Sequence, residues 1–230
     1  MKNIKFSNSY IVKKNVNFVK REYSIASKHK QENKKVKWGS YLSMINRLKI
    51  SLSLLKKKKY RNWLDIGSGT GKFFLLADKI NFKTDDRVGI EMNKNLIKYS
   101  KKKIYKFKTK FINSDIVKLK DKKKYELVTL IGVLQNCGHH PEFFLKKIIL
   151  KIKKGGILFL TTKNINWKKF KKNEALLEKD HSWFDIKDLE NNLKKLKLKI
   201  LKKGGFIPHK NKIVKISSAN SFFILVRKNI

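Results

Sequence analysis

Apolar and polar residues follow two spacings along this chain, one typical of strands and one typical of helices. Short apolar runs alternate with longer segments in which apolar residues return every three or four positions. The run at 125–133 is almost continuously apolar, as expected for a strand that is covered on both faces. The strands predicted in this way span 61–66, 87–91, 109–114, 125–133, 157–162, 198–206 and 221–227. The predicted helices span 38–55, 71–80, 93–105, 141–153 and 185–197.

The regular alternation of these elements predicts an α/β fold, with a parallel sheet and helices on both of its faces. Residues 10–37 precede it as a polar, basic segment with spaced apolar residues, to which no element is assigned. The chain shows no internal repeat and no linker long enough to separate two domains. We therefore divide it into an N-terminal helical extension, 1–59, and one main domain, 60–230.

The stretch from Trp63 to Phe74 indicates a binding site. A short apolar run is followed by Gly67, Gly69 and Gly71 at alternate positions, and a helical pattern then begins. Glycine lets the backbone turn tightly and approach a ligand, and the next helix offers free N–H groups at its positive end. A nucleotide-like ligand is expected. A dinucleotide fingerprint needs a glycine where this chain has Lys72, and no phosphate-loop pattern is present, so NAD is disfavoured.

The charge of the chain is open to two interpretations. There are 58 basic residues against 17 acidic ones, a net charge of +41, which favours nucleic acid or an anionic membrane surface as a partner. However, only five of the 58 are arginines, and the lysines are scattered. Readers of phosphate and bases rely heavily on arginine. Abundant Lys, Asn, Ile and Phe are also what an A+T-rich coding bias produces.

The single cysteine, Cys137, excludes an internal disulfide framework and fits a reducing cytoplasm. No Cys/His cluster has zinc-binding spacing, so no metal site is predicted. The N-terminus has neither an uninterrupted apolar core nor a small-residue cleavage site, so it is not expected to be a secretory signal. No apolar run approaches the roughly 20 residues that a membrane span requires.

The segment Leu64–Gly71 resembles the first motif of the class I S-adenosylmethionine (SAM) methyltransferases. The resemblance covers roughly 60–228 and includes Glu91 at the end of the second strand, Asp115 after the third, and the turn at Lys153–Leu158. It implies a Rossmann-like sheet of seven strands, mostly parallel with an antiparallel last strand. It also implies helices on both faces and an N-terminal helical cap over the cofactor, which is SAM. The alternative is that the leading helix, 38–55, only covers one face of the sheet.

The residues expected to bind this cofactor are Asp65, Gly67, Ser68, Gly69, Gly71, Glu91, Met92, Asp115 and Ile116. The three acids fall at the carboxyl ends of the first three strands, where open α/β sheets bind ligands. Glu91 is expected to bind both ribose hydroxyls, as the equivalent acid does in related folds. Asp115 is expected to accept from the adenine amino group, with Ile116 or Met92 against the ring, and Asp65 to pair with the methionine ammonium. The alternative for each acid is a solvated carboxylate near lysines.

Within this superfamily the chain is most similar to the ubiquinone-biosynthesis O-methyltransferases and comparable small-molecule enzymes. The segments Val133–Pro141 and Asp180–Phe184 carry that similarity. Many members have an acid and a histidine where this chain has Asn136 and Cys137. The departure leaves the acceptor and any catalytic base open.

Methyl transfer from a sulfonium is an in-line displacement, so the protein mostly supplies proximity and alignment. A base is needed only when the acceptor is a hydroxyl that must lose its proton. Imidazole titrates near neutrality, which makes His139, His140 and His181 the candidates. We name His140 and His181 as candidate catalytic residues, with a surface or helix-capping role as the alternative. A nucleophilic Cys137 is disfavoured because no proline adjoins it.

The sequence thus predicts a cytoplasmic SAM-dependent methyltransferase that modifies an oxygen of a small or lipid-like acceptor molecule. RNA is the first alternative substrate, favoured by the charge, although the [DNS]-P-P-[YFW] motif of exocyclic-amine methyltransferases is absent. A second alternative is a non-catalytic module of the same fold that binds RNA or a protein.

Overall fold

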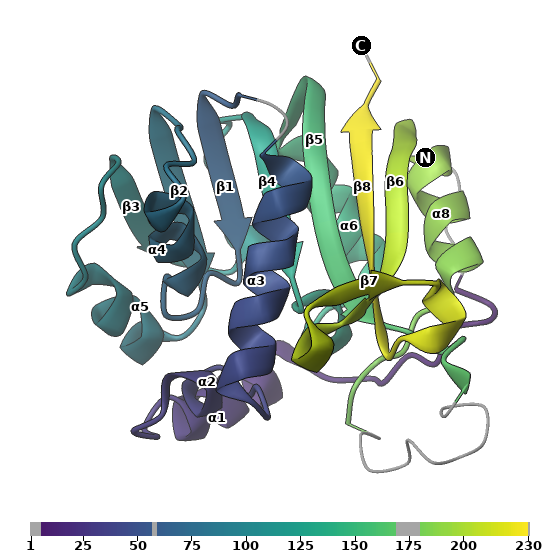
Figure 1. Cartoon of the computed structure of the whole chain (residues 1–230), viewed down its shortest axis with the longest axis horizontal. Helices are drawn as coiled ribbons and strands as arrows, with labels where there is room; N and C mark the ends of the chain where they lie inside the picture. The colour runs from purple at the N-terminus through teal and green to yellow at the C-terminus, as the bar shows by residue number, and fades with distance from the viewer. Residues whose placement is uncertain (1–5, 57–58, 169–179, 230) are drawn as a thin grey trace.

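The computed structural model describes residues 6–56, 59–168 and 180–229. Within them, eight strands form one sheet in the order β3-β2-β1-β4-β5-β8-β6-β7 (Figure 1). Strands β1 to β5 pair in parallel, β8 lies antiparallel between β5 and β6, and β7 pairs antiparallel with β6. The strands are β1 Asn62–Ile66, β2 Asp86–Glu91, β3 Thr109–Asn113, β4 Tyr125–Ile131, β5 Ile152–Lys163, β6 Leu198–Ile207, β7 Lys212–Val214 and β8 Ser221–Lys228.

The α/β class and the antiparallel last strand are confirmed, but the count of seven strands is wrong by one. The additional strand, β7, has three residues, too few to show a period in the sequence. Two predicted breaks are also absent. Gly155 and Gly156 lie inside β5 rather than before it, and Gly204 and Gly205 lie inside β6.

Helices cover both faces of the sheet. The described α-helices are α1 Val16–Ala26, α2 Glu32–Lys35, α3 Tyr41–Leu55, α4 Lys72–Lys79, α5 Lys94–Lys101, α6 Pro141–Leu150 and α8 Ile186–Lys195. Helices α3, α4 and α5 share one hydrophobic core with the sheet, and α6 and α8 share the other. Helices α1 and α2 lie below the lower ends of the parallel strands in Figure 1, in the segment to which the sequence assigned no element.

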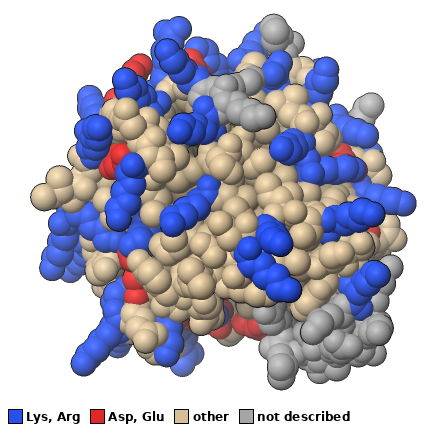
Figure 2. All heavy atoms as spheres, in the orientation of Figure 1, with Lys and Arg blue, Asp and Glu red and all other residues tan. Residues whose placement is uncertain are grey.

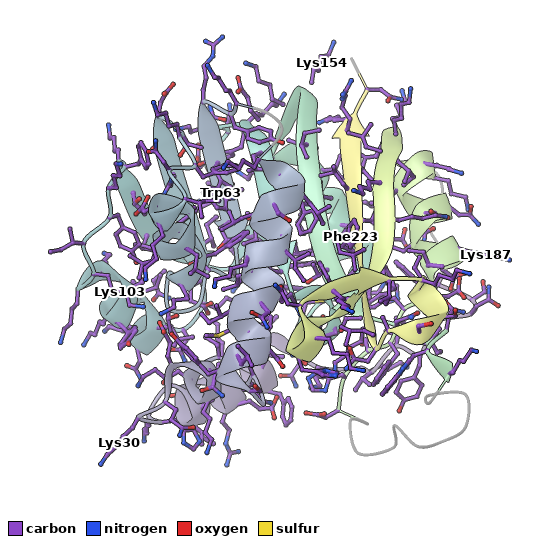
Figure 3. All side chains as sticks on the ribbon, viewed as in Figure 1. Lys30, Trp63, Lys103, Lys154, Lys187 and Phe223 are labelled. Atoms are coloured by element: carbon purple, nitrogen blue, oxygen red, sulfur yellow. The ribbon has the colours of Figure 1, made fainter. Side chains whose placement is uncertain are left out.

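The two cores are built by alternation along each strand, since successive side chains of a strand point to opposite faces. Trp63 of β1 and Phe223 of β8 lie on the face covered by α3 (Figure 3). Their neighbours Leu64 and Ile224 are buried on the opposite face. Trp63 meets Phe74 of α4 edge-on, with ring centroids 4.7 Å apart, so α4 is fixed directly above the strand that leads into the glycine turn.

Two helix starts agree with the sequence. The Asp185 side chain accepts hydrogen bonds from the backbone N–H groups of Lys187 and Asp188, which caps α8. Pro141 occupies the first turn of α6, where its missing N–H is not needed. Among the described residues, no helix is long and apolar enough to cross a membrane.

The residues before α3 form what we call the N-terminal cover, residues 6–38. Tyr10 pairs with Trp183 through two backbone hydrogen bonds of 2.8 Å. On α2, the Glu32 carboxylate binds Lys72 at 2.9 Å and Lys103 at 2.6 Å. The cover is therefore attached both to the segment before α8 and to the segments that follow the glycine turn and α5.

Candidate active site

A pocket lies at the carboxyl ends of β1, β2, β3 and β4, between these ends and the N-terminal cover. Its floor is made by the loops that follow these strands, and its roof by side chains of α1 and of the segment after α2. The lining residues are Val19, Lys20, Tyr23, Val36, Trp38, Ile66, Gly67, Gly69, Ile90, Glu91, Met92, Asn93, Ser114, Asp115, Ile116, Ile131, Gly132, Val133, Asn136, Cys137, Gly138, His139 and Phe144. Because loops from separate strands converge here, the pocket is where this fold is able to hold a ligand.

The glycine turn brings backbone close to this pocket but uses its own N–H groups internally. Gly67 and Ser68 donate to the carbonyl of Ile90 at 2.8 and 3.0 Å, and Gly69 donates to Oε2 of Glu91 at 3.1 Å. Gly69 has φ +52°, and a Cβ there would lie 2.8 Å from Cγ1 of Val36. The turn is therefore hydrogen-bonded to the end of β2, and the missing side chain at Gly69 leaves room for Val36 of the cover.

Gly71 differs from the other two glycines because it faces away from the pocket. Its φ is +73°, and a Cβ there would lie 2.2 Å from the hydroxyl of Tyr105. The residue is buried and is absent from the pocket lining. A glycine is needed at position 71 because the Tyr105 side chain, from the segment after α5, packs directly against it.

Glu91 ends β2 with its carboxylate facing the pocket. Oε1 accepts from the N–H of Asn93 at 2.9 Å, while Oε2 accepts from Gly69. Burial raises the pKa of Glu91, and the backbone donors partly offset that effect. Each oxygen keeps a lone pair, so the carboxylate is a fixed acceptor for two neighbouring hydroxyl groups.

Asp65 lies deeper, at the end of β1, beside an adjoining cavity that Ser68 and Lys72 also line. Trp63 Nε1 donates to Thr129 Oγ1 at 2.8 Å, and Thr129 in turn donates to Asp65 Oδ1 at 2.6 Å. Burial raises the pKa of Asp65 to about 7, against the lowering effect of the Thr129 hydrogen bond. Among the described residues, the buried Ser68 hydroxyl has no hydrogen-bond partner.

The remaining predicted residues meet at the other end of the pocket. Met92, Asp115 and Ile116 all line it, from the ends of β2 and β3. His139 joins them from the loop after β4, with Nε2 2.6 Å from Asp115 Oδ2. Its ring lies nearly parallel to that of Phe144, at 15° and 6.0 Å between centroids.

The two candidate catalytic histidines lie outside this lining. His140 is exposed at the position that precedes α6, and His181 has Nδ1 2.9 Å from Asp180 Oδ1. Neither side chain contributes to the pocket or to the cavity beside Asp65.

Sequence reasoning expected an N-terminal helical cap but did not identify the residues of that cap that line the pocket. Tyr23 and Trp38 enter the pocket from the cover, and burial, followed by the nearby Glu91 charge, raises the pKa of Tyr23. A helical spacing was present in Val16, Val19 and Tyr23 and would have predicted α1. Among the described residues, no group of His, Cys, Asp and Glu side chains is arranged to hold a metal ion.

A family model described as Methyltransferase domain matches residues 38–203 of the chain. The match begins just before α3 and ends within β6, so it contains the glycine turn, Glu91, Asp115 and His139. No curated protein sequence matches the chain.

Solved structures with the same fold include the N-methyltransferase NodS from Bradyrhizobium japonicum WM9, in complex with S-adenosyl-L-homocysteine. It is 12% identical, covers 91% of this chain and 98% of its own, and has a TM-score of 0.65. The cyclase SpnF is 14% identical, with coverages of 96% and 98% and a TM-score of 0.68. A chain from the complex between the Haloferax volcanii Trm112 methyltransferase activator and a methyltransferase is 12% identical, with coverages of 80% and 89% and a TM-score of 0.63. At these identities the likeness shows the fold alone.

Proposed function

The chain belongs to the methyltransferase domain family, and we propose that it transfers a methyl group from SAM to a small acceptor held beneath the N-terminal cover. The observation that carries the small acceptor is the roof of the pocket. Val19 and Tyr23 of α1, with Trp38, cover the ends of the strands, and most of the lining is apolar. A covered apolar pocket suits a small or lipid-like molecule better than a polynucleotide.

The residues present fit the cofactor. The fixed carboxylate of Glu91 suits a ribose diol, Asp115 with Met92 and Ile116 suits adenine, and buried Asp65 suits an ammonium group. When bound, SAM supplies a methyl group already activated on a sulfonium. The protein's part is to hold that group and the acceptor in line, which accounts for roughly 7–11 kcal/mol of barrier in well-oriented reactions.

We propose an acceptor that is already nucleophilic when it binds, so that no side chain has to remove a proton from it. Of the lining groups outside the cofactor residues, His139 is paired with Asp115, and burial raises the pKa of the Cys137 thiol to about 12. The raised pKa of Tyr23 keeps that phenol protonated. An oxygen that arrives ionised, or an uncharged amine, needs no proton acceptor from the protein. The sequence favoured oxygen, and the name of NodS supports the amine.

The first test is calorimetric titration with SAM, after removal of nucleic acid in high salt. The wild type should bind SAM and not NAD. Gly69→Val should abolish SAM binding, because a side chain at Gly69 would clash with Val36 and would occupy the space where the cofactor approaches the backbone. Gly39→Val is the matched control, since nothing lies within 4 Å of a Cβ at that exposed glycine. Retained SAM binding by a folded Gly69→Val variant would make the turn merely structural.

RNA is the second candidate substrate, and the net charge of +41 favours it. Figure 2 shows lysine and arginine side chains spread over the visible face rather than gathered into one patch. The two candidate substrates are distinguished by how strongly their binding and methylation depend on salt concentration. Binding driven by phosphates weakens steeply between low and moderate salt. Methylation of a small acceptor that changes little over that range would exclude RNA as the substrate.

A further inference from the structure

His139 is bound to the aspartate at the proposed adenine end. Its Nε2 lies 2.6 Å from Asp115 Oδ2, and only 16% of the His139 side chain and 3% of the Asp115 side chain are exposed. A carboxylate oxygen offers only lone pairs, so Nε2 carries the hydrogen in this contact. The two side chains form a buried donor–acceptor pair in the wall of the pocket.

Both oxygens of Asp115 are held in place. Oδ1 accepts from the N–H of Val117 at 3.0 Å, which caps the short 3-10 helix Ile116–Lys118. Oδ2 is held by His139, so rotation of the carboxylate would break two hydrogen bonds. Each oxygen still has a second lone pair, and the pair therefore presents an acceptor in one fixed orientation.

His139 is itself fixed from two sides. Its ring lies against Phe144, at an interplanar angle of 15°. Its neighbour Gly138 packs so closely on α1 that a Cβ there would lie 2.6 Å from the backbone of Val16. The imidazole therefore has a rigid support in both α6 and the cover.

We propose that His139 is a positioning residue that makes the pocket selective for a 6-aminopurine over a 6-oxopurine. The inference rests on the proposed function, in which Asp115 faces adenine. A fixed carboxylate accepts from an amino group, whereas it repels the lone pairs of an oxo group in the same place. Without His139, the Asp115 carboxylate would rotate more freely, and the difference in affinity between the two purines would be smaller.

The test measures the affinities of S-adenosyl-L-homocysteine and of its analogue with hypoxanthine in place of adenine, both by calorimetry. The wild type should prefer the adenine compound by about 10- to 100-fold, the range for one hydrogen bond to a charged group. His139→Phe keeps a ring beside Phe144 without the donor, and the preference should fall at least threefold. His139→Gln places an amide nitrogen near the Nε2 position and should restore it. His209→Phe, at an exposed histidine outside the pocket, is the matched control and should leave it unchanged.

The alternative is that the pair only stabilises the fold. In that case His139→Phe weakens both compounds by the same factor, and an unchanged preference overturns the inference. If the Phe variant does not fold, His139→Asn gives the same comparison, because its amide nitrogen stops near the Nδ1 position. A wild type that binds neither compound would instead overturn the proposed function, so the two failures are distinguishable.

Discussion

Replacing Asp65 by Asn should stabilise the protein, and more so as the pH rises. Burial raises the pKa of Asp65 from 3.8 to about 7 in the folded protein. Below pH 3.8 the group is protonated in both states. Between 3.8 and 7 only the unfolded chain is ionised, so each rise in pH disfavours folding, and above 7 the full cost is present.

The size of the effect follows from the shift. At about 1.4 kcal/mol per pH unit, a shift of about three units destabilises the folded state by about 4 kcal/mol above pH 7. About 3 kcal/mol of this develops between pH 5 and pH 8 by the same conversion. Asn keeps an oxygen that accepts the Thr129 hydrogen bond, so the variant removes the charge and little else.

The assay is urea unfolding of the wild type and Asp65→Asn at pH 5 and pH 8, in the absence of ligand. The advantage of the variant should grow by about 3 kcal/mol between these two pH values. Asp85→Asn, at an exposed aspartate, is the control and should show no such growth. An advantage of equal size at both pH values would refute the idea that buried Asp65 is ionised at a cost.

Three further predictions concern the site and the core. Glu91→Ala should weaken SAM binding by about 1.5–3 kcal/mol in calorimetry, the range for hydrogen bonds to a charged group, and an unchanged affinity in a folded variant would remove Glu91 from the site. Gly138→Ala should increase amide hydrogen exchange in α1, because its Cβ would lie 2.6 Å from the Val16 backbone; unaltered exchange would contradict that packing. Arg87→Met should lower the free energy of unfolding by about 3–5 kcal/mol, since Asp78 loses its buried cation, and a loss below about 1 kcal/mol would speak against this pair.

The sequence was most informative where one local pattern decides the structure. The glycine turn between β1 and α4 and the apolar run of β4 were predicted because each carries its own signal within a few residues. Helix α1 was not predicted, since Val16, Val19 and Tyr23 lie among charged residues. Their helical form is supported by packing on a loop far along the chain.

The pairing of Asp115 with His139 depends on how far two loops reach. The residues follow β3 and β4, which are separated in the sheet by β2 and β1. Sequence reasoning places both at the same edge of the sheet, but the lateral reach of each loop comes from packing between α6 and the segment after β3. His139 was therefore considered as a base, whereas in the structure it contacts Asp115.

The family match begins at residue 38, whereas α1, which roofs the pocket, ends at Ala26. Helix α1 therefore lies outside the part of the chain that the family model describes, whereas Trp38 and the floor of the pocket lie inside it. Under the proposed function, substitutions in α1 would reshape the space for the acceptor and leave Glu91 and Asp115 in place. The residues that select the acceptor would then be able to change separately from the residues that hold the methyl donor.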